Sequence, residues 1–175
     1  MFLETERLML RKIEEADFDA FCGYAMDDEM SRMMGNALHH TREDARLTFA
    51  WLKDKEERCY VLILKETGAV IGHLTVCKVQ SELMKLDALC GKKGCSMSFC
   101  ISRFYRRRGL MEEAVRAVIA RLFEESMDFV QCGYFSFNEA SARLQEKLGF
   151  VYLTTQQFEE DGETIVAVEN ILWKK

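Results

Sequence analysis

The chain has 175 residues, of which 49% are hydrophobic and 30% charged, and its formal net charge is -5 at pH 7. These values are typical of a soluble globular protein, so we expect residues 1–175 to form a single domain. The acidic balance argues against nonspecific binding to nucleic acid or to an anionic membrane, and it favours a cationic acceptor such as an amine. No apolar run is long enough to cross a bilayer and no signal-peptide core is present, which predicts a cytoplasmic location.

Seven cysteines are scattered along the chain, and without a secretion signal we interpret them as reduced thiols. The nearest approach to a metal motif is Cys90 and Cys95, with Cys100 five residues further on. Because a zinc site needs a fourth ligand and closer spacing within each pair, we predict no metal, and a metal-bound interaction domain is the weakest interpretation. His73 lies within a strand pattern and is interpreted as a packing or hydrogen-bonded residue.

The first expected strand covers residues 3–13, where Leu8 and Leu10 alternate with arginines. Asp17 is then expected to cap a helix that carries two phenylalanines.

A second helix is predicted from residue 42 to residue 57. Thr41 is its expected N-cap, since a threonine oxygen accepts well from the free amides of a first turn. Leu47, Trp51 and Leu52 form its expected apolar stripe.

Three strands are predicted next, at residues 59–65, 70–79 and 95–102. The polar residues 66–68, Glu-Thr-Gly, predict a hairpin between the first two of these strands.

The second half of the chain alternates helices and strands. A long helix to about residue 126 has an apolar face, and a second helix begins at Asn138 and stops at Gly149. The residues of that apolar face are Leu110, Ala114, Val118 and Leu122. Strands are expected at residues 129–137, 150–158 and 164–173. The whole order predicts an α/β fold (α+β) with a mixed, mostly antiparallel sheet, one β-α-β crossover and helices on both faces.

The strongest local signal is the segment from Arg106 to Met111, between a strand and the start of a helix. A helix N-terminus offers free amides and a partial positive charge to a phosphate, and Gly109 allows the backbone a close approach. Arg106, Arg107 and Arg108 add cationic planar donors. The segment therefore indicates a diphosphate site; the alternative is a solvated basic loop that caps the helix.

This segment resembles the acyl-CoA pyrophosphate loop of the GNAT N-acetyltransferase superfamily, Arg/Gln-x-x-Gly-x-Gly/Ala. Arg106 and Gly109 match the pattern, whereas Met111 replaces its last small residue. The opening LETERLMLR resembles that of the ribosomal-protein N-terminal acetyltransferases, and residues 138–150, NEASARLQEKLGF, match best of all. The resemblance covers essentially the whole chain.

The resemblance implies a GNAT fold of about seven strands that splay between the fourth and fifth. It also implies acetyl-CoA as cosubstrate and no metal. The pantetheine arm would lie along the fourth strand, near Phe99, Cys100 and Ile101, and would hydrogen-bond Asn138. Ser141 would face the thioester sulfur. The pyrophosphate would bind the backbone N–H groups of Arg107, Arg108, Gly109, Leu110 and Met111.

Two catalytic positions depart from the family. Ser96 stands where many relatives have a glutamate base, and Gln145 stands where others have a tyrosine that donates to the leaving sulfur. Ser141 is a candidate donor to the thiolate, and the base is not identified. Glu112 is interpreted as a partner of the helix dipole.

The implied function is direct acetyl transfer from acetyl-CoA to a primary amine, either a protein N-terminus or a small molecule. The enzyme is expected to be a monomer or a homodimer. The alternative is a non-catalytic CoA-binding regulatory module of the same fold.

The connection at residues 80–94 is longer than the family's usual hairpin. It predicts a short helix with Ser81 as N-cap, which would bring Glu82 and Asp87 to an acceptor pocket. The alternative is a solvated excursion on the surface.

Overall fold

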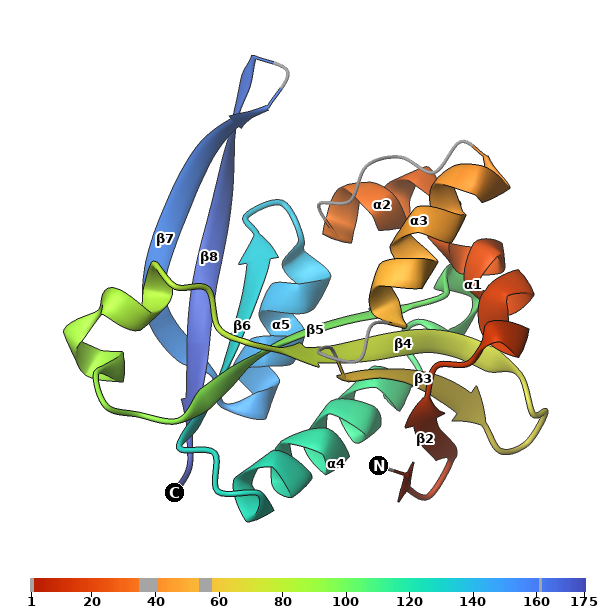
Figure 1. The fold of residues 1–175 in the computed structure, drawn as a ribbon, viewed down its shortest axis with the longest axis horizontal. Helices are drawn as coiled ribbons and strands as arrows, with labels where there is room; N and C mark the ends of the chain where they lie inside the picture. The colour runs from red at the N-terminus through yellow and green to blue at the C-terminus, as the bar shows by residue number, and fades with distance from the viewer. Residues whose placement is uncertain (1, 35–40, 54–57, 161) are drawn as a thin grey trace. The chain divides into compact units, whose positions relative to one another are not determined.

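The computed structural model describes residues 2–34, 41–53, 58–160 and 162–175. Within these ranges, eight strands follow the hydrogen-bonded order β1-β2-β3-β4-β5-β6-β8-β7. The sheet is mixed and mostly antiparallel, as predicted, with β5 and β6 paired in parallel (Figure 1). The chain divides into two compact units, which are described in turn. The first comprises Met1–Val76 and Phe99–Val118, and the second comprises Cys77–Ser98 and Ile119–Lys175.

The first unit begins with a hairpin where one continuous strand was predicted. Its strands are β1 (Leu3–Glu4), β2 (Leu8–Lys12), β3 (Arg58–Leu64) and β4 (Val70–Cys77), the last residue of which belongs to the second unit. The Thr5 amide donates to the Leu8 carbonyl at 2.9 Å, and the Leu8 amide donates to the Thr5 hydroxyl at 3.0 Å. These bonds close a turn, so the predicted strand 3–13 is wrong: β1 folds back on β2 and raises the strand count to eight.

The predicted turn between β3 and β4 is confirmed. Gly68 adopts a left-handed φ of 69°, and its amide donates to the Leu64 carbonyl at 2.8 Å. A side chain at this position would strain the backbone, which explains the glycine.

Helices cover both faces of the strands of the first unit (Figure 1). They are η1 (Glu15–Asp17), α1 (Phe18–Ala25), α2 (Asp28–Met34), α3 (Arg42–Leu52), η4 (Arg103–Tyr105) and the first part of α4 (Leu110–Glu124). Short α2 was not predicted. Thr41 is the N-cap of α3, as predicted, since its side chain accepts from the Asp44 amide. Residues 54–57, the expected end of that helix, lie outside the described residues.

Asp17 does not cap α1 with its side chain, contrary to the prediction. Its carboxylate instead accepts from the Glu14 amide at 2.8 Å and from both terminal nitrogens of Arg11 at 2.7 Å. The helix start is therefore held by a buried bidentate ion pair.

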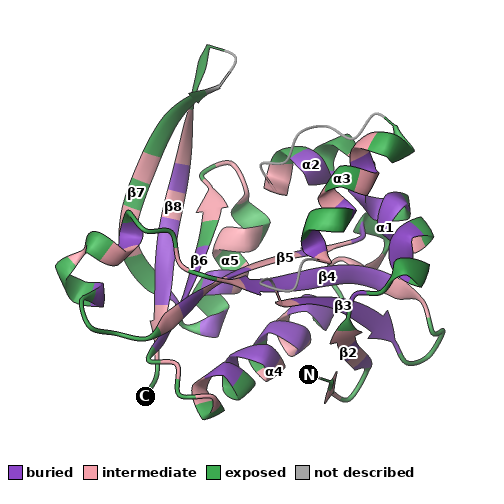
Figure 2. Ribbon diagram, viewed as in Figure 1, coloured by how far each residue is buried: buried purple, intermediate pink, exposed green. Residues whose placement is uncertain are grey.

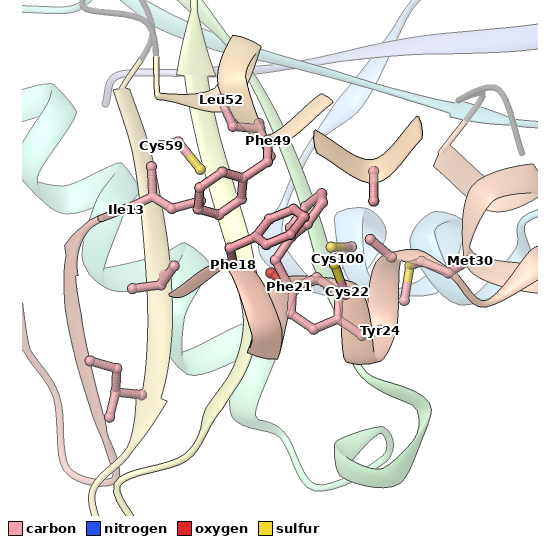
Figure 3. Close-up of a cluster of buried hydrophobic side chains, with 14 residues drawn as sticks. Ile13, Phe18, Phe21, Cys22, Tyr24, Met30, Phe49, Leu52, Cys59 and Cys100 are labelled. Atoms are coloured by element: carbon pink, nitrogen blue, oxygen red, sulfur yellow. The ribbon is translucent and has the colours of Figure 1, made fainter. Parts of the chain in front are cut away.

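The core of the first unit corrects part of the predicted face of α3, of which Leu52 is buried as predicted. Leu47 and Trp51 are 74% and 54% exposed, whereas Phe49 is fully buried. Phe49 packs against Phe18 and Phe21 with ring centroids 5.1 and 5.3 Å apart (Figure 3). The helix has apolar residues on two faces. The face that carries Phe49 is buried, because its ring packs against aromatic rings of α1.

The second unit consists of strands packed between helical segments. Its elements are η2 (Leu83–Lys85), η3 (Asp87–Leu89), the start of β5 (Gly94–Ile101), the end of α4, β6 (Phe129–Phe135), α5 (Glu139–Leu148), β7 (Val151–Glu160) and β8 (Glu163–Trp173). Leu83 and Leu89 pack against Phe129 and Ile171. The predicted helix at residues 81–89 is wrong, since two separate 3-10 turns provide these leucines.

The apolar face of α4 is confirmed, because all four predicted residues are at most 1% exposed. Figure 2 shows buried residues recurring along this helix. The start and stop of α5 are also confirmed: Asn138 is its N-cap and Gly149 ends it with a φ of 88°. None of the described helices is both long enough and apolar enough to cross a membrane.

Strands β5 and β6 are paired only at their beginnings. The parallel register joins Gly94 to Phe129, Cys95 to Val130 and Ser96 to Gln131, and no later pair is formed. Strand β6 nevertheless continues to Phe135, paired with β8 on its other side. The sheet therefore opens beside β6 after Gln131, at the strand pair where the splay was predicted.

Candidate functional site

The loop between β5 and α4 presents a run of free backbone amides. Among the described residues, the N–H groups of residues 107–111 have no hydrogen-bond partner, and the first bond of α4 joins the Glu113 amide to the Gly109 carbonyl at 3.1 Å. Arg107 and Gly109 both have left-handed φ angles, of 60° and 73°. Left-handed residues next to a helix start can direct neighbouring amides outward, as in the backbone nests that bind anions. Such amides can hold a phosphate without any side chain.

The three predicted arginines of this loop differ in their surroundings. Arg106 forms an ion pair with Glu29 at 2.9 Å, so its charge is partly compensated within the unit. Arg107 and Arg108 are exposed, and the guanidinium of Arg108 lies 5.7 Å from the Tyr105 ring centroid. Two cations thus remain open to solvent beside the free amides. The side chains of Leu110 and Met111 are buried in the core, so only their backbone is available to a ligand.

Residues from the N-terminal hairpin brace this loop. Arg7 donates to the Arg108 carbonyl at 2.8 Å and to Glu113 at 2.7 Å. Glu113 also accepts from the Thr5 hydroxyl at 2.5 Å and from the Arg7 amide at 2.8 Å. Burial alone would raise the pKa of the Glu113 carboxyl, but these hydrogen bonds and the Arg7 charge outweigh it and lower the pKa. Glu113 is therefore an ionised anchor for the loop.

The end of β5 lies in the first unit and is held closely against β4. A Cβ atom on Gly72 would come within 2.3 Å of the Cys100 carbonyl oxygen, so only glycine permits this approach. The Cys100 sulfur lies 3.2 Å from Nδ1 of His73, which also hydrogen-bonds the Tyr24 hydroxyl at 3.1 Å. Burial lowers the pKa of His73 to about 4 and raises the pKa of Cys100 to about 12.

These two residues are neutral near pH 7, and His73 is a buried hydrogen-bonded residue, as predicted. The neighbouring Phe99 and Ile101 are partly buried.

The start of α5 contains the second group of predicted residues. The Asn138 side-chain oxygen accepts from the Ser141 amide at 3.1 Å. The Ser141 hydroxyl in turn accepts from Nε2 of Gln145 at 3.1 Å, and Gln145 is fully buried. Its Nε2 also donates to the Gly133 carbonyl at 3.4 Å, and its oxygen accepts from Asn170 at 3.1 Å.

This network fixes the Gln145 amide, since the Gly133 carbonyl can only accept and must therefore face the nitrogen end. Gln145, which replaces the tyrosine of many relatives, therefore positions Ser141.

A carboxylate that the sequence analysis missed lies on β8. Glu169 is only 7% exposed and accepts from Nε2 of Gln131, the residue paired with Ser96. The sequence carries a signal for it: Glu169 alternates in phase with the buried residues Ala167 and Ile171. A charged residue at a core position of a strand is uncommon and indicates a specific role.

The acidic residues proposed for the acceptor pocket are placed differently. Glu82 is 73% exposed and forms an ion pair with Lys85 at 2.7 Å, and Asp87 is exposed as well. This placement argues against a proton relay through either residue. Among the described residues, no group of three or more His, Cys, Asp and Glu side chains could hold a metal ion.

Comparison with known proteins supports the sequence resemblance. Residues 7–151 match the family model described as the acetyltransferase (GNAT) domain. The chain is similar to the SPbeta prophage-derived uncharacterized N-acetyltransferase YokL of Bacillus subtilis (strain 168), with 28% identity over 152 residues, covering 83% of this chain and 77% of the relative.

Solved structures show the same fold. An acetyltransferase (GNAT family) from Bacillus anthracis has a TM-score of 0.83 at 20% identity, with 99% of this chain and 98% of that chain covered. The ribosomal-protein-S5-alanine acetyltransferase from Vibrio fischeri has a TM-score of 0.72 at 18% identity, with both chains fully covered at 100%. At these identities the likeness concerns the fold. The family model extends over most of the chain, and on that ground the protein belongs to the GNAT family of acetyltransferases and is an enzyme of the N-acetyltransferase class.

Proposed function

We propose that the protein transfers the acetyl group of acetyl-CoA directly to a primary amine, carried by a protein N-terminus or by a small molecule. The observation that carries this proposal is the run of free amides at residues 107–111 beside two exposed arginines. A diphosphate is the group that such a site suits best, and acetyl-CoA contains one.

The proposed roles follow from the two units taken separately. In the first unit, the amides of residues 107–111, with Arg106, Arg107 and Arg108, would bind the pyrophosphate, and the backbone of residues 99–101 would accompany the pantetheine arm. In the second unit, Asn138 would hydrogen-bond that arm.

The protein must position the thioester and the amine and must assist proton transfer. Acetyl-CoA supplies an activated acetyl thioester. The acceptor arrives mostly protonated, because lysine-like amines titrate near pH ~10 and terminal amines near ~8. The enzyme must therefore accept a proton from the acceptor and favour a leaving thiolate.

Ser141 suits the second of these tasks. Gln145 donates to its oxygen, so the hydroxyl proton of Ser141 is free to point at another acceptor. A thiolate with a pKa of roughly 8.5 leaves without full protonation, and a single hydroxyl donor is adequate.

The test is acetyl transfer across a panel of amines, read as release of free thiol and, by mass spectrometry, as addition of one acetyl group to the acceptor. The panel includes peptides with a free N-terminal alanine, because one structural neighbour is named for a ribosomal-protein alanine. Binding of CoA by calorimetry is measured in parallel. CoA binding with no transfer to any amine would instead favour the non-catalytic CoA-binding module.

A further inference from the structure

Glu169 is a buried carboxylate without a cation. It is 7% exposed, and its Oε2 atom accepts from the neutral amide of Gln131. None of the described residues forms an ion pair with it, and its Oε1 atom has no hydrogen-bond partner among them. An ionised carboxylate in such a place is costly unless a cation or further donors complete it. The Glu169 carboxyl therefore lacks, among the described residues, the partners that an ionised carboxylate needs at a buried position.

The carboxylate lies against an exposed part of the sheet. Glu169 on β8 is directly opposite Gly133 on β6, and a Cβ atom added to Gly133 would come within 2.5 Å of Oε2 and 3.1 Å of Oε1. Gly133 is exposed although it lies in the middle of a strand. Strand β5 stops pairing with β6 two residues earlier, at Gln131. The carboxylate therefore lies beside an exposed backbone position where β5 and β6 have separated.

Gly133 also connects Glu169 to the other candidate group. Its carbonyl accepts from Gln145, which donates as well to the Ser141 hydroxyl. The Glu169 carboxylate and the Gln145 amide that orients Ser141 therefore both contact Gly133, at the point where the sheet opens. A purely structural role for Glu169 does not require an exposed glycine beside it, nor an oxygen left without a donor.

We propose that Glu169 is the catalytic residue that binds the ammonium group of the acceptor and accepts its proton. This role rests on the proposed function, and it replaces the glutamate that relatives place at the position of Ser96. It also assigns the substrate class: the acceptor enters as a cation and forms an ion pair with Glu169.

The proton balance of the step is simple. The carboxylate takes one proton from R–NH3+, and the resulting R–NH2 attacks the thioester carbonyl carbon. A C–N bond forms, the C–S bond breaks, and the electron pair of that bond leaves on sulfur. The nitrogen releases its second proton to solvent as the amide forms, and the thiolate gains one proton from solvent, directly or through Ser141, which solvent then reprotonates. Glu169 releases its proton to solvent. The sum is one amide, one thiol and one proton.

The protonation chemistry of the site agrees with this role. Burial raises the pKa of the Glu169 carboxyl, and the Gln131 hydrogen bond reduces the rise. A carboxylate with a raised pKa is a stronger base than a solvated one. Among the described residues, the Cys132 thiol interacts with the Glu169 charge; burial and that charge raise the pKa of the thiol, which stays neutral near pH 7.

The first test is Glu169→Gln, which keeps the shape and removes the base. We expect kcat/KM for amines to fall about 100-fold or more at neutral pH. The deficit should shrink as the pH approaches the pKa of the acceptor, where the amine deprotonates unaided. Glu82→Gln is the matched control, because Glu82 is an exposed glutamate of the same unit, and its kcat/KM should equal that of the parent.

The second test moves the carboxylate without altering it. Gly133→Ala places a methyl group where the flexible end of Glu169 lies, so the chain folds while the carboxylate is displaced. We expect kcat/KM for amines to fall about ten-fold or more, since misplaced catalytic groups lose rate steeply. Affinity for CoA, measured by calorimetry, should change less than two-fold, about the error expected for an unaffected site.

The outcomes separate the two proposals. A parent that binds CoA but acetylates no amine overturns the proposed function and the role of Glu169 together. An active parent whose Glu169→Gln variant keeps its rate, or loses the same factor at every pH, overturns the role of Glu169 alone. A pH-dependent loss in that variant, together with a loss in Gly133→Ala, supports it.

Discussion

The side-chain amide of Gln145 donates a hydrogen bond to the hydroxyl oxygen of Ser141 across 3.1 Å. A hydroxyl that accepts from one side must donate elsewhere, so this contact orients the only proton that Ser141 can give. The Gly133 carbonyl, which can only accept, prevents the Gln145 amide from reversing its ends.

Replacing Ser141 by alanine should therefore lower kcat by roughly ten-fold, below the usual range for acid catalysis because a thiolate leaves easily. The melting temperature should change little, since the hydroxyl is only partly buried. Steady-state kinetics with saturating acetyl-CoA measures the effect. Ser136→Ala, at an exposed serine of the same unit, is the control. An unchanged kcat in Ser141→Ala would remove Ser141 from the mechanism.

Asn138 caps α5 and is also assigned to the pantetheine arm, and two substitutions separate these roles. Asn138→Ala loses the cap, at a cost of about 1 kcal/mol in unfolding free energy. Asn138→Ser restores a good cap but lacks the amide donor. If Asn138 binds the cosubstrate, both variants lose turnover and only the alanine variant loses stability. Full activity in Asn138→Ser would show that the residue is a cap alone.

A negative charge at Gly109 should prevent CoA from binding the free amides. Gly109→Asp and Gly109→Ala share the strain of a left-handed backbone, about 1 kcal/mol. The difference between their affinities for CoA therefore reports the effect of the charge. We expect the aspartate variant to bind CoA at least ten-fold more weakly than the alanine variant in calorimetry, about 1.4 kcal/mol. Equal affinities in the two variants would place the pyrophosphate elsewhere.

The buried pair of Asp17 and Arg11 should make stability depend on pH in the acid range. Burial alone would raise the pKa of the Asp17 carboxyl, but the Arg11 and Glu14 hydrogen bonds outweigh it and lower the pKa. The stabilisation is therefore complete above the unfolded pKa of about 3.9 and is lost as the pH falls through the lower, folded value.

Asp17→Asn should cost about 3 kcal/mol at pH 7, because it leaves the Arg11 charge without its partner. Thermal unfolding of parent and variant between pH 7 and acid conditions measures this difference, which should narrow only below the unfolded pKa. A stability difference that stays constant with pH would mean that the ion pair does not cause it.

Glu169 should affect stability with the opposite sign. A carboxyl whose folded pKa is raised binds its proton more tightly in the native state, so its contribution is full below the unfolded pKa of about 4.3 and is lost as the pH rises. Glu169→Gln should thus melt at a higher temperature than the parent at pH 7 and at a similar temperature near pH 4. A lower melting temperature at pH 7 would show that the charge stabilises the fold.

The sequence predicted those features that depend on local chemistry. Thr41, Asn138 and Gly149 act at helix ends, where a side-chain oxygen or a left-handed glycine is needed irrespective of the rest of the fold. The turn at Gly68 and the buried face of α4 belong to the same class.

What the sequence did not predict depends on contacts between distant residues. Leu47 and Phe49 are equally apolar, and only the aromatic partners on α1 decide which is buried. Asp17 had a capping pattern but pairs with Arg11 instead. The role proposed for Glu169 depends on its contacts with Gln131 and Gly133, which lie on another strand far earlier in the chain.

The contacts of Arg7 affect when the loop of residues 106–111 becomes ordered during synthesis and which shortened proteins keep it ordered. Arg7 and Glu113 are 106 residues apart in the chain, yet their contact holds the Arg108 carbonyl in place. On the ribosome, the loop therefore stays unbraced until α4 has been made. In the laboratory, trimming the first seven residues would leave the sheet largely intact and would loosen the loop, so a shortened protein would remain folded while its affinity for CoA declined.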